Sequence, residues 1–450
     1  MSRTRRMLRR GAVSVATRAL RVAPMRKMWD FLAQVHREAR TAPQTSLNPD
    51  IPEIGPIVPR ADDTKIRRLN LLVPTVSRKH VFGGIQTALL ICAALRQHFD
   101  QVRIISTDDS TADCHPDSYY AGWPVVGLDQ PPPACDHIVT AGARYGQTLA
   151  VGARDFFLAT AWWTAHNSFA LIDWQKRTFA EAAEHKLLYI VQDFEPGFYP
   201  WSSRYALAEA TYRRPEETIA IINSRFLAEY LTQQGYDFPH SCVLHPRLNP
   251  EIAKIWSQSS TFSKERIILA YGRPGVERNA FSIIVGALRN WVANTPGATE
   301  WRILAAGEEF PDIDLGRGCR LSCVGKLELE EYAQLLKKTA IGLSLMISPH
   351  PSYPPLELAA FGARVVTNRF SNKDLSLISS FITTVDPLSS ESLAAALSER
   401  VREFESSAEN EHLIERTSVD ISDDFLAVEK WEAVWPEAIM SLLPPLDTPQ

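Results

Sequence analysis

The sequence predicts an α/β protein with two doubly wound domains, and two observations support this fold class. Short apolar runs alternate with helix-length amphipathic segments from residue 69 onward, a pattern typical of parallel sheets covered by helices on both faces. The pattern occurs twice, on either side of a polar stretch at residues 249–264, which we interpret as a mobile hinge. Such folds bind ligands at the carboxyl ends of their strands, so we expect a site in a central cleft that the two domains face.

Ten apolar runs are the predicted strands. They lie at residues 69–73, 102–105, 137–141, 187–191 and 219–222 in the first half, and at 267–271, 302–305, 320–324, 341–347 and 364–366 in the second. We expect four parts: a basic tail and linker (1–65), a first domain (66–255), a second domain (256–425), and a C-terminal helix crossing back to the first domain (426–450).

Composition and charge exclude several functional classes. The chain has 45% hydrophobic and 22% charged residues, which are ordinary globular values. Its net charge is −4, but residues 1–40 carry +9 and the remainder −13, so a nucleic acid is not an expected partner. No apolar run approaches the roughly 18 residues of a membrane span. Six cysteines without a paired C-x-x-C pattern predict reduced thiols in a cytoplasmic protein.

The basic tail has an apolar face. Five small or apolar residues recur at helical spacing: Leu8, Ala12, Val15, Ala19 and Val22. This pattern predicts a basic helix that rests on an anionic membrane surface. A disordered tail and an organelle transit peptide remain as alternatives. Residues 41–63 contain five prolines and are interpreted as a linker.

Three loops that follow predicted strands are candidate phosphate sites. Gly83 and Gly84 precede a helix, where backbone N–H groups can approach a phosphate, although on its own such a pair is more typical of a tight strand-to-helix turn. Arg273 and Arg278 in "GRPGVER" present forked donors that match phosphate oxygens, with solvated surface arginines as the alternative. Lys326 follows another strand and could face a nucleotide.

A proline-rich loop, "LMISPHPSYPPLELAAFG", leads from a strand into a helix that begins with an acid. The prolines restrict the loop, so Tyr353 and Glu357 are presented with little entropy left to lose on binding. A carboxylate at such a junction can accept ribose hydroxyls. The structural alternative for Glu357 is favourable interaction with the helix dipole. Asp312 and Asp314 form a D-x-D pattern without supporting ligands, so no metal site is predicted.

With these motifs the chain resembles glycosyltransferase family 4, whose GT-B fold has two Rossmann-like domains. The G-R-x-x-x-x-K motif of that family is matched at Gly272 and Arg273, with Arg278 in place of the lysine. The second of the family's two spaced glutamates matches Glu357, whereas the first falls at Pro349. This departure leaves the donor sugar open.

Four longer motifs, "HVFGGI", "VQDFEPGFYPWSSRYALAEATY", "YGRPGVERNAF" and "SLMISPHPSYPPLELAAFG", resemble WsaF-type rhamnosyltransferases of bacterial surface-glycan synthesis. The resemblance implies a dTDP-β-L-rhamnose donor, with Arg273 and Arg278 at the diphosphate and Lys326, Tyr353 and Glu357 around the nucleoside. It also implies retention of configuration without a metal or other cofactor. The acceptor would be a glycan or lipid-linked glycan, and the enzyme would be cytoplasmic or peripheral on the inner face of the membrane.

The resemblance makes the first domain the acceptor domain and the second the nucleotide-sugar domain. Carboxylates and aromatic faces suited to sugars follow a strand of the first domain, and they are expected to bind the acceptor through Gln192, Glu195, Tyr199 and Trp201. Asp193 is the expected catalytic carboxylate, beside Arg273 and Arg278. A core-packed aromatic loop is the alternative. Two other functions stay open: transfer from a UDP- or GDP-hexose, and a non-catalytic carbohydrate-binding or scaffold role.

Overall fold

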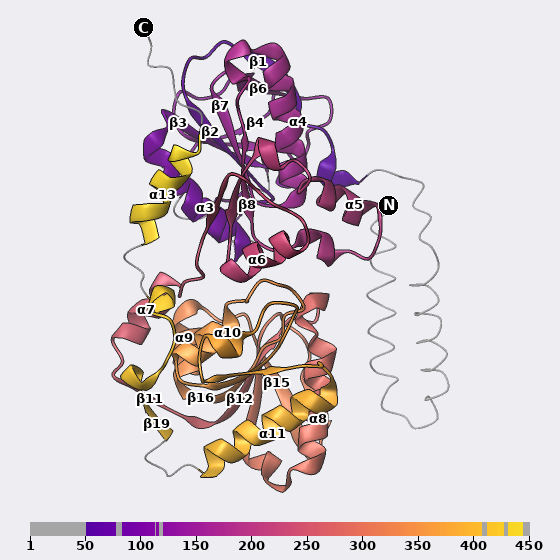
Figure 1. Ribbon diagram of the computed structural model, residues 1–450, viewed down its shortest axis with the longest axis vertical. Helices are drawn as coiled ribbons and strands as arrows, with labels where there is room; N and C mark the ends of the chain where they lie inside the picture. Colours follow the sequence, from indigo (N-terminus) through magenta and orange to yellow (C-terminus); the bar gives the residue numbers. More distant parts are fainter. Residues whose placement is uncertain are drawn as a thin grey trace. The chain divides into compact units, whose positions relative to one another are not determined.

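A computed structural model of the protein describes residues 51–77, 83–112, 114–116, 120–406, 412–426 and 431–443 (Figure 1). The predicted amphipathic helix of residues 1–40 lies outside the described residues, so its role at a membrane stays a prediction. The first three residues of the "HVFGGI" motif are also outside them. The described residues from Pro52 onward belong to one compact unit.

The described residues of the first half form an eight-stranded sheet in the order β10-β9-β8-β7-β2-β3-β5-β4. Every neighbouring pair in it is parallel. Its strands are β2 (Arg68–Val73), β3 (Gln101–Ser106), β4 (Val125–Gly127), β5 (His137–Thr140), β7 (Asp155–Ala159), β8 (Leu187–Val191), β9 (Thr218–Ile222) and β10 (Ser241–Val243). Parallel strands of this kind need both faces covered.

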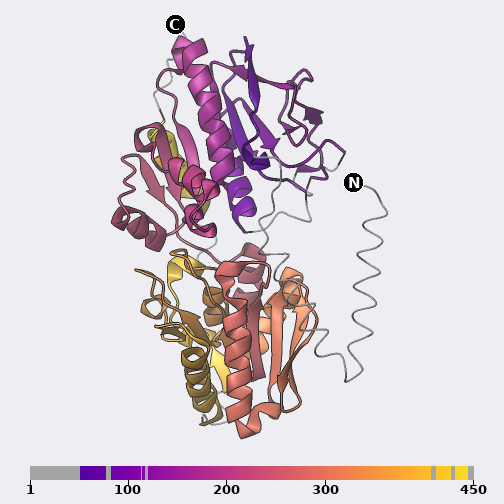
Figure 2. The same cartoon turned by 90° about the vertical axis from the view of Figure 1, so that its right-hand side faces the viewer.

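Helices cover both faces of this sheet and bury two separate cores (Figures 1 and 2). On one face, α3 (Gly84–Leu95) and α13 (Trp431–Ser441) contribute Ile91 and Ile439 to the same core, so the C-terminal helix returns to the first sheet. On the other, α4 (Trp162–Thr178) and α6 (Arg225–Gln233) contribute Phe169 and Leu227. A further short helix, α5 (Ser203–Ala210), follows the loop after β8.

Seven strands of the described second half form a sheet in the order β14-β15-β13-β12-β16-β17-β18, parallel except for β14. They are β12 (Glu265–Gly272), β13 (Arg302–Gly307), β14 (Ile313–Gly316), β15 (Cys319–Gly325), β16 (Thr339–Leu343), β17 (Arg364–Asn368) and β18 (Ile382–Val385). Helices α8 (Phe281–Asn294) and α11 (Ser390–Ser406) bury one face, and α9 (Leu329–Lys338) and α10 (Pro354–Ala360) the other. Both halves are therefore doubly wound, which confirms the predicted fold class.

Each predicted strand overlaps an observed one, but the strand expected at residues 341–347 ends earlier. β16 stops at Leu343 because the backbone of Met346 is bound by a side chain instead of a neighbouring strand. The Met346 N–H donates to Asn368 Oδ1 at 2.7 Å, and Asn368 Nδ2 donates back to the Met346 carbonyl at 3.0 Å. The central strand β7 was not predicted, because "DFFLA" runs directly into the apolar start of α4.

The polar stretch at residues 249–264 is not an irregular loop but mostly regular secondary structure, and its role as a hinge stays a prediction. It forms α7 (Pro250–Ser257), capped by Asn249, whose Oδ1 accepts from the Glu251 N–H at 2.9 Å. It then forms β11 (Thr261–Ser263), which pairs antiparallel with β19 (Leu413–Glu415). Lys264 is buried and its Nζ donates to the Leu336 carbonyl at 3.1 Å.

The described end of the predicted linker is also ordered. Within residues 51–63, β1 (Val58–Asp62) pairs in parallel with β6 (Thr148–Gly152) of the first half. Arg60 reinforces this pair, because its Nη1 donates to the Thr148 carbonyl at 2.6 Å. Proline content therefore misled the prediction here, since a short strand tolerates prolines at its edge.

A buried ion network lies at the amino ends of the first sheet. Arg68 Nε donates to Asp155 Oδ1 at 2.7 Å, and Arg103 Nη2 is 3.4 Å from Asp155 Oδ2. All three side chains are at most 1% exposed. Burial alone would raise the pKa of Asp155, but Arg68 and Arg103 lower it below its usual value. The network is far along the strands from their carboxyl ends, so we assign it to stability.

Replacing Asp155 with Asn should therefore lower the free energy of unfolding by about 3–5 kcal/mol, because buried Arg103 loses its paired carboxylate and Arg68 keeps only Asp62, at 3.1 Å. Denaturant unfolding at pH 7 measures this. As a control, Glu300→Gln removes the exposed partner of Arg266 and should cost less than about 1 kcal/mol. The Asp155 contribution should be present above its unfolded pKa of about 3.9 and be lost as pH falls through its lowered folded value. Equal effects of the two substitutions would contradict the assignment.

Candidate functional site

The predicted donor-binding residues follow neighbouring strands of the second sheet. Arg273 follows β12, Lys326 follows β15, and Tyr353 and Glu357 follow β16. Because β15, β13, β12 and β16 are parallel neighbours, their carboxyl ends meet at one edge of the sheet. The structure therefore brings these loops to the edge where doubly wound folds bind ligands, with Lys326 exposed there.

Arg273 is held at this edge by an acid from the next strand. Its Nε is 3.4 Å from Glu308 Oε1, and the Gly275 N–H donates to Glu308 Oε2 at 2.7 Å. The β12 and β13 loops approach closely, since Gly307 has a φ of +142° and a Cβ there would overlap the Gly272 carbonyl. Arg273 keeps about a third of its side chain (37%) exposed, so its guanidinium is oriented but still accessible.

Arg278 pairs with the predicted catalytic carboxylate Asp193, whereas Arg273 pairs with Glu308. Arg278 Nε is 3.8 Å from Asp193 Oδ2, and its guanidinium lies 4.2 Å from the centre of the Phe198 ring. Among the described residues, Arg278 Nε has no hydrogen-bond partner although it is buried. The structure therefore brings Asp193 and Arg278 together from the two halves, whereas Arg273 pairs elsewhere.

Asp193 also reaches the proline-rich loop. Its Oδ1 accepts hydrogen bonds from the Ser348 hydroxyl and from the Phe194 N–H, the latter at 2.8 Å. The Ser348 hydroxyl in turn accepts from the His350 N–H at 3.0 Å, and His350 Nδ1 accepts from the Ser352 N–H at 3.0 Å. Polar side chains thus fix the loop together with its prolines. Ser348 and His350 were not predicted, because nothing in a single sequence distinguishes them from ordinary loop residues.

A buried lysine lies behind this loop. Lys373 is fully buried, and its Nζ donates to the Met346 carbonyl at 2.6 Å and lies 3.5 Å from the His350 carbonyl. Burial lowers the pKa of Lys373 to about 7, and the charge of Asp193 opposes this shift. Lys373 was not predicted, since it lies in a polar stretch, "NRFSNKDL", that is typical of a solvated loop.

Glu357 lies on α10 and is almost completely buried. Burial raises the pKa of its carboxyl group to about 7, while a hydrogen bond from Tyr332 acts in the opposite direction. The Tyr332 hydroxyl on α9 donates to Glu357 Oε2 at 3.0 Å. Tyr353, half-buried at the start of α10, packs its ring against His350 with centroids 5.9 Å apart. Tyr332 was not predicted, because α9 reads as an ordinary amphipathic helix.

The glycine pair and Gln192 contact each other in the first half. Gln192 Nε2 donates to the Gly84 carbonyl at 2.6 Å and to the Thr160 hydroxyl. A Cβ at Gly84 would overlap the end of the Gln192 side chain, so a larger residue there would displace Gln192 from its present position. Gly83, with a φ of +44°, is the N-cap residue of α3. Gln192, predicted to bind an acceptor, therefore joins the loop after β8 to the start of α3.

The other predicted acceptor residues occupy different environments. Glu195 is buried and accepts from the Trp162 N–H at the first turn of α4, and burial raises its pKa to about 8. The Tyr199 hydroxyl accepts from Trp162 Nε1 at 2.9 Å. Trp201, by contrast, is 95% exposed. Glu195 and Tyr199 thus have structural partners of their own, and a role for them in acceptor binding stays a prediction.

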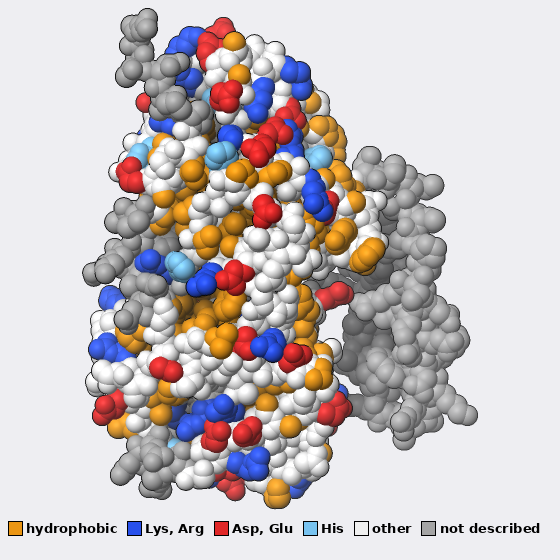
Figure 3. Space-filling view, viewed as in Figure 1, with side chains coloured by type: hydrophobic (Ala, Val, Ile, Leu, Met, Phe, Trp, Pro, Cys, Tyr) orange, Lys and Arg blue, Asp and Glu red, His pale blue; other side chains and the backbone are white. Residues whose placement is uncertain are grey.

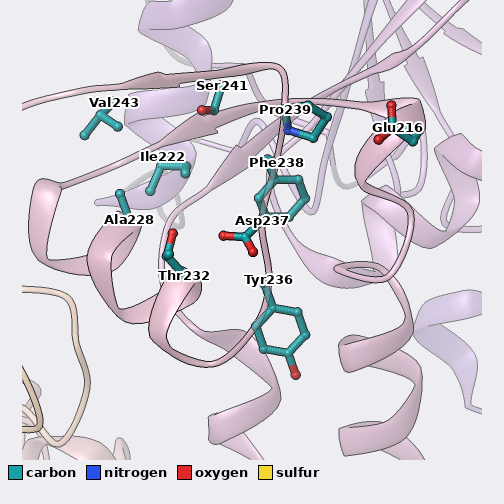
Figure 4. Close-up of a pocket in the computed structure, with 10 residues that line it drawn as sticks. All are labelled: Glu216, Ile222, Ala228, Thr232, Tyr236, Asp237, Phe238, Pro239, Ser241 and Val243. Atoms are coloured by element: carbon teal, nitrogen blue, oxygen red, sulfur yellow. The ribbon is translucent and has the colours of Figure 1, made fainter.

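Two hollows lie in the described part of the chain. One of 450 Å³ is lined by residues at the carboxyl ends of β13 and β15, next to Lys326: Glu309, Phe310, Cys323, Val324 and Gly325. The other, of 360 Å³, lies between α6 and the edge strand β10, where Tyr236, Phe238, Ile222 and Val243 contribute to its lining (Figure 4). Only the first is at the edge that carries the predicted donor residues.

The described residues contain no candidate metal-binding cluster and no candidate membrane-spanning helix. In that part of the chain, no three His, Cys, Asp or Glu side chains are grouped so that they could hold a metal ion. Asp312 of the D-x-D pattern accepts from the Cys323 N–H at 3.0 Å and so fixes a strand. No helix there combines the length and apolar character needed to cross a bilayer. On the face drawn in Figure 3, acidic and basic side chains are interspersed.

Comparison with solved structures confirms the GT-B fold. Sucrose-phosphate synthase from Thermosynechococcus elongatus aligns over 84% of this chain and 95% of its own, with a TM-score of 0.50 and 14% identity. The UDP-forming α,α-trehalose-phosphate synthase from Burkholderia vietnamiensis aligns over 83% and 99%, with a TM-score of 0.53 and 10% identity. WaaG, a glycosyltransferase involved in lipopolysaccharide biosynthesis, aligns over 82% and 99%, with a TM-score of 0.50 and 13% identity. At these identities the likeness concerns the fold alone.

Sequence comparison gives a narrower result. The O-antigen biosynthesis protein RfbC of Myxococcus xanthus is 32% identical over 223 residues, which are 48% of this chain and only 16% of RfbC. The family profile "WsaF, N-terminal domain" matches residues 68–225, and "WsaF, C-terminal domain" matches residues 266–398. The two matches span well over half of the sequence and include both sheets, so the protein belongs to the WsaF family.

Proposed function

We propose that the protein is a glycosyltransferase that moves L-rhamnose from dTDP-β-L-rhamnose to a growing bacterial surface polysaccharide. The observation that carries this proposal is the carboxyl edge of the second sheet, where the cations Arg273 and Lys326 and the buried acid Glu357 come from three neighbouring loops. Membership of the WsaF family supports the donor class. The name of RfbC, an O-antigen biosynthesis protein, supports a surface glycan as the acceptor.

The diphosphate of the donor would bind the two arginines. Arg273 is oriented by Glu308 yet partly exposed, and Arg278 has a buried Nε–H without a hydrogen-bond partner in the described structure. A diphosphate oxygen would satisfy that donor, and guanidinium forks suit phosphate geometry. The start of α3, with Gly83 and Gly84, would add backbone N–H groups. These positive groups would replace a metal ion in neutralising the leaving group, so we propose a metal-independent reaction.

The nucleoside would be held by the proline-rich loop and the start of α10. Glu357 would accept a hydrogen bond from the deoxyribose hydroxyl, and Tyr353 and Lys326 would border the nucleoside. Because burial already raises the pKa of Glu357 to about 7, its charged form is costly in the empty protein. A hydroxyl donor from the ligand would lower this cost, which favours donor binding.

Transfer would proceed on one face of the sugar, with retention of configuration. The bond between the anomeric carbon and the diphosphate oxygen breaks, the acceptor hydroxyl oxygen bonds to that carbon, and the acceptor proton passes to the departing diphosphate. Arg273 and Arg278 would stabilise the developing negative charge. Asp193, 3.8 Å from Arg278 and fixed by Ser348, would either orient the acceptor or stabilise positive charge on the sugar.

The cellular location follows from the same proposal. All six cysteines lie in described residues and are free thiols, as expected for a reducing compartment. We therefore place the reaction in the cytoplasm, and a membrane contact through residues 1–40 would make the protein peripheral on the inner face.

A panel of nucleotide sugars tests the function against its alternatives. In the presence of EDTA, dTDP-β-L-rhamnose should raise the melting temperature more than UDP-glucose or GDP-mannose, because a ligand that binds the folded state stabilises it by mass action. Release of dTDP in the same buffer should follow. A larger shift with a UDP- or GDP-hexose would indicate a different donor. Binding of sugars without any release of nucleotide would indicate a non-catalytic carbohydrate-binding protein.

The phosphate site predicts a defect for Arg273→Ala. Loss of a charge-assisted contact of about 1.5–3 kcal/mol should lower kcat/KM for the donor by about 10- to 150-fold. The matched control is Arg302→Ala at the amino end of β13, where the side chain is 65% exposed and pairs with Glu265. This control should behave as the wild type. Unchanged kinetics for both Arg273→Ala and Arg278→Ala would remove the arginines from the donor site.

The nucleoside site predicts opposite effects of Glu357→Gln on stability and binding. A raised folded pKa means that the carboxyl group costs stability as pH rises from its unfolded value, about 4.3, through about 7. At pH 8 the amide removes this cost, so the ligand-free melting temperature should hold or rise. Affinity for dTDP, measured by calorimetry, should fall by about 10- to 150-fold, because a charged acceptor is lost.

Tyr332→Phe is the matched control for this experiment. It removes the hydroxyl that donates to Glu357 but keeps the carboxylate itself. Binding of dTDP should therefore survive in Tyr332→Phe better than in Glu357→Gln. If Glu357→Gln lowers the melting temperature and leaves dTDP affinity unchanged, Glu357 has a structural role only.

A further inference from the structure

An aromatic pair lies where the loop after β8 leads into α5: Trp201 is exposed and Tyr205 is half-buried. Trp201 is 95% exposed, and no other large hydrophobic side chain in the described residues is as exposed. Its ring lies nearly parallel to that of Tyr205, with centroids 6.2 Å apart and planes at 20°. Tyr205 belongs to the first turn of α5, and its N–H donates to the Ser202 hydroxyl at 3.3 Å. We call Trp201 and Tyr205 the aromatic platform.

The backbone around the aromatic platform is held by contacts of the neighbouring residues Tyr199 and Arg204. Tyr199 accepts from the indole N–H of Trp162, which is fully buried. Arg204 forms an ion pair with Glu53 at 2.8 Å and lies 6.0 Å from the centre of the Tyr199 ring. Exposure of Trp201 contributes nothing to the core and leaves a large apolar surface in water. Binding of a ligand to this surface would cost the protein little conformational entropy, because the backbone of this segment is already held in place.

The platform adjoins the proposed transfer site. The short 3-10 helix η6 (Glu195–Phe198) begins two residues after Asp193, and its Phe198 ring contacts the Arg278 guanidinium. Trp201 is three positions after Phe198, so their Cα atoms are at most about 11 Å apart. Hydrophobic side chains gather at this edge of the first half, beside α5 (Figures 1 and 3). An acceptor chain whose end reaches Asp193 could therefore extend over the platform.

We propose that Trp201 and Tyr205 form a second acceptor subsite, which binds a sugar ring of the growing glycan behind its reacting end. This inference rests on the proposed function and deepens it: the preferred substrate would be an oligosaccharide chain rather than a single sugar. The apolar C–H face of a sugar packs on an aromatic ring. The charged rim, formed by Arg204 and Glu53, suits the hydroxyl groups at the edge of that ring. A protein or lipid partner would instead need a wider apolar patch.

Chain-length dependence of the acceptor tests the subsite. The probes are an aryl-tagged rhamnoside and the corresponding tetrarhamnoside, used with dTDP-β-L-rhamnose. In the wild type kcat/KM should be higher for the tetrasaccharide, and Trp201→Ala should reduce the ratio of the two values by about tenfold, through KM rather than kcat. Trp201→Phe should restore part of the ratio. Leu377→Ala, which removes another exposed apolar side chain (81%), is the matched control and should keep the wild-type ratio.

Direct binding separates this inference from the proposed function. Calorimetry of the tetrarhamnoside with the full chain, without donor, should show weaker binding for Trp201→Ala at an unchanged melting temperature. If no nucleotide sugar is turned over but this difference in binding remains, the proposed function fails and the subsite stands. If transfer occurs and the two acceptors give the same ratio in wild type and variant, the subsite is wrong. The subsite is also wrong if Trp201→Ala alters binding to phosphatidylglycerol vesicles and not to the tetrasaccharide.

Discussion

The Asp193 carboxylate is the contact on which the arrangement of the candidate site depends. It follows a strand of the first sheet, yet it accepts from Ser348 and faces Arg278, both from loops of the second. Its negative charge also raises the pKa of the buried Lys373, against the effect of burial. A single carboxylate thus neutralises cations that burial makes costly, and it fixes the proline-rich loop whose next residues begin α10. Without it, the partly buried Arg278 and the buried Lys373 would each lose the favourable interaction with its negative charge.

Several ionisable groups at this junction are kept in unfavourable environments. Burial raises the pKa of Glu357 to about 7 and that of Glu195 to about 8, and it lowers the pKa of Lys373 to about 7. At neutral pH each of these groups lowers the free energy of unfolding, because burial removes hydrating water from its charged form. Groups perturbed in this way gather where a protein binds ligands or performs chemistry. Glu195 differs in that it has a structural role, because it accepts a hydrogen bond from the N–H of the first residue of α4.

The sequence was informative wherever the relevant signal is local. Apolar runs located the strands, and the positions of Arg273, Lys326 and Glu357 after those strands placed them correctly at one edge of the sheet. Contacts between segments that are distant in the sequence could not be predicted from it. The Asn368 side chain ends β16 early by binding Met346, and the partner of Glu357 is Tyr332 on another helix. Residues 249–264 look polar and mobile in sequence, but their few apolar side chains pack into the core of the second half.

The close approach of Gly84 and Gln192 has a thermodynamic consequence. The start of α3 and the loop that carries Asp193 are in direct contact, because Gln192 Nε2 donates to the Gly84 carbonyl and lies where a side chain at Gly84 would be. If a nucleotide binds at the start of α3 and an acceptor at the loop after β8, as proposed, a shift of one segment would act on the other through this contact. The free energies of binding two substrates on either side of such a contact are coupled, and the coupling is reciprocal: each substrate changes the affinity for the other by the same factor.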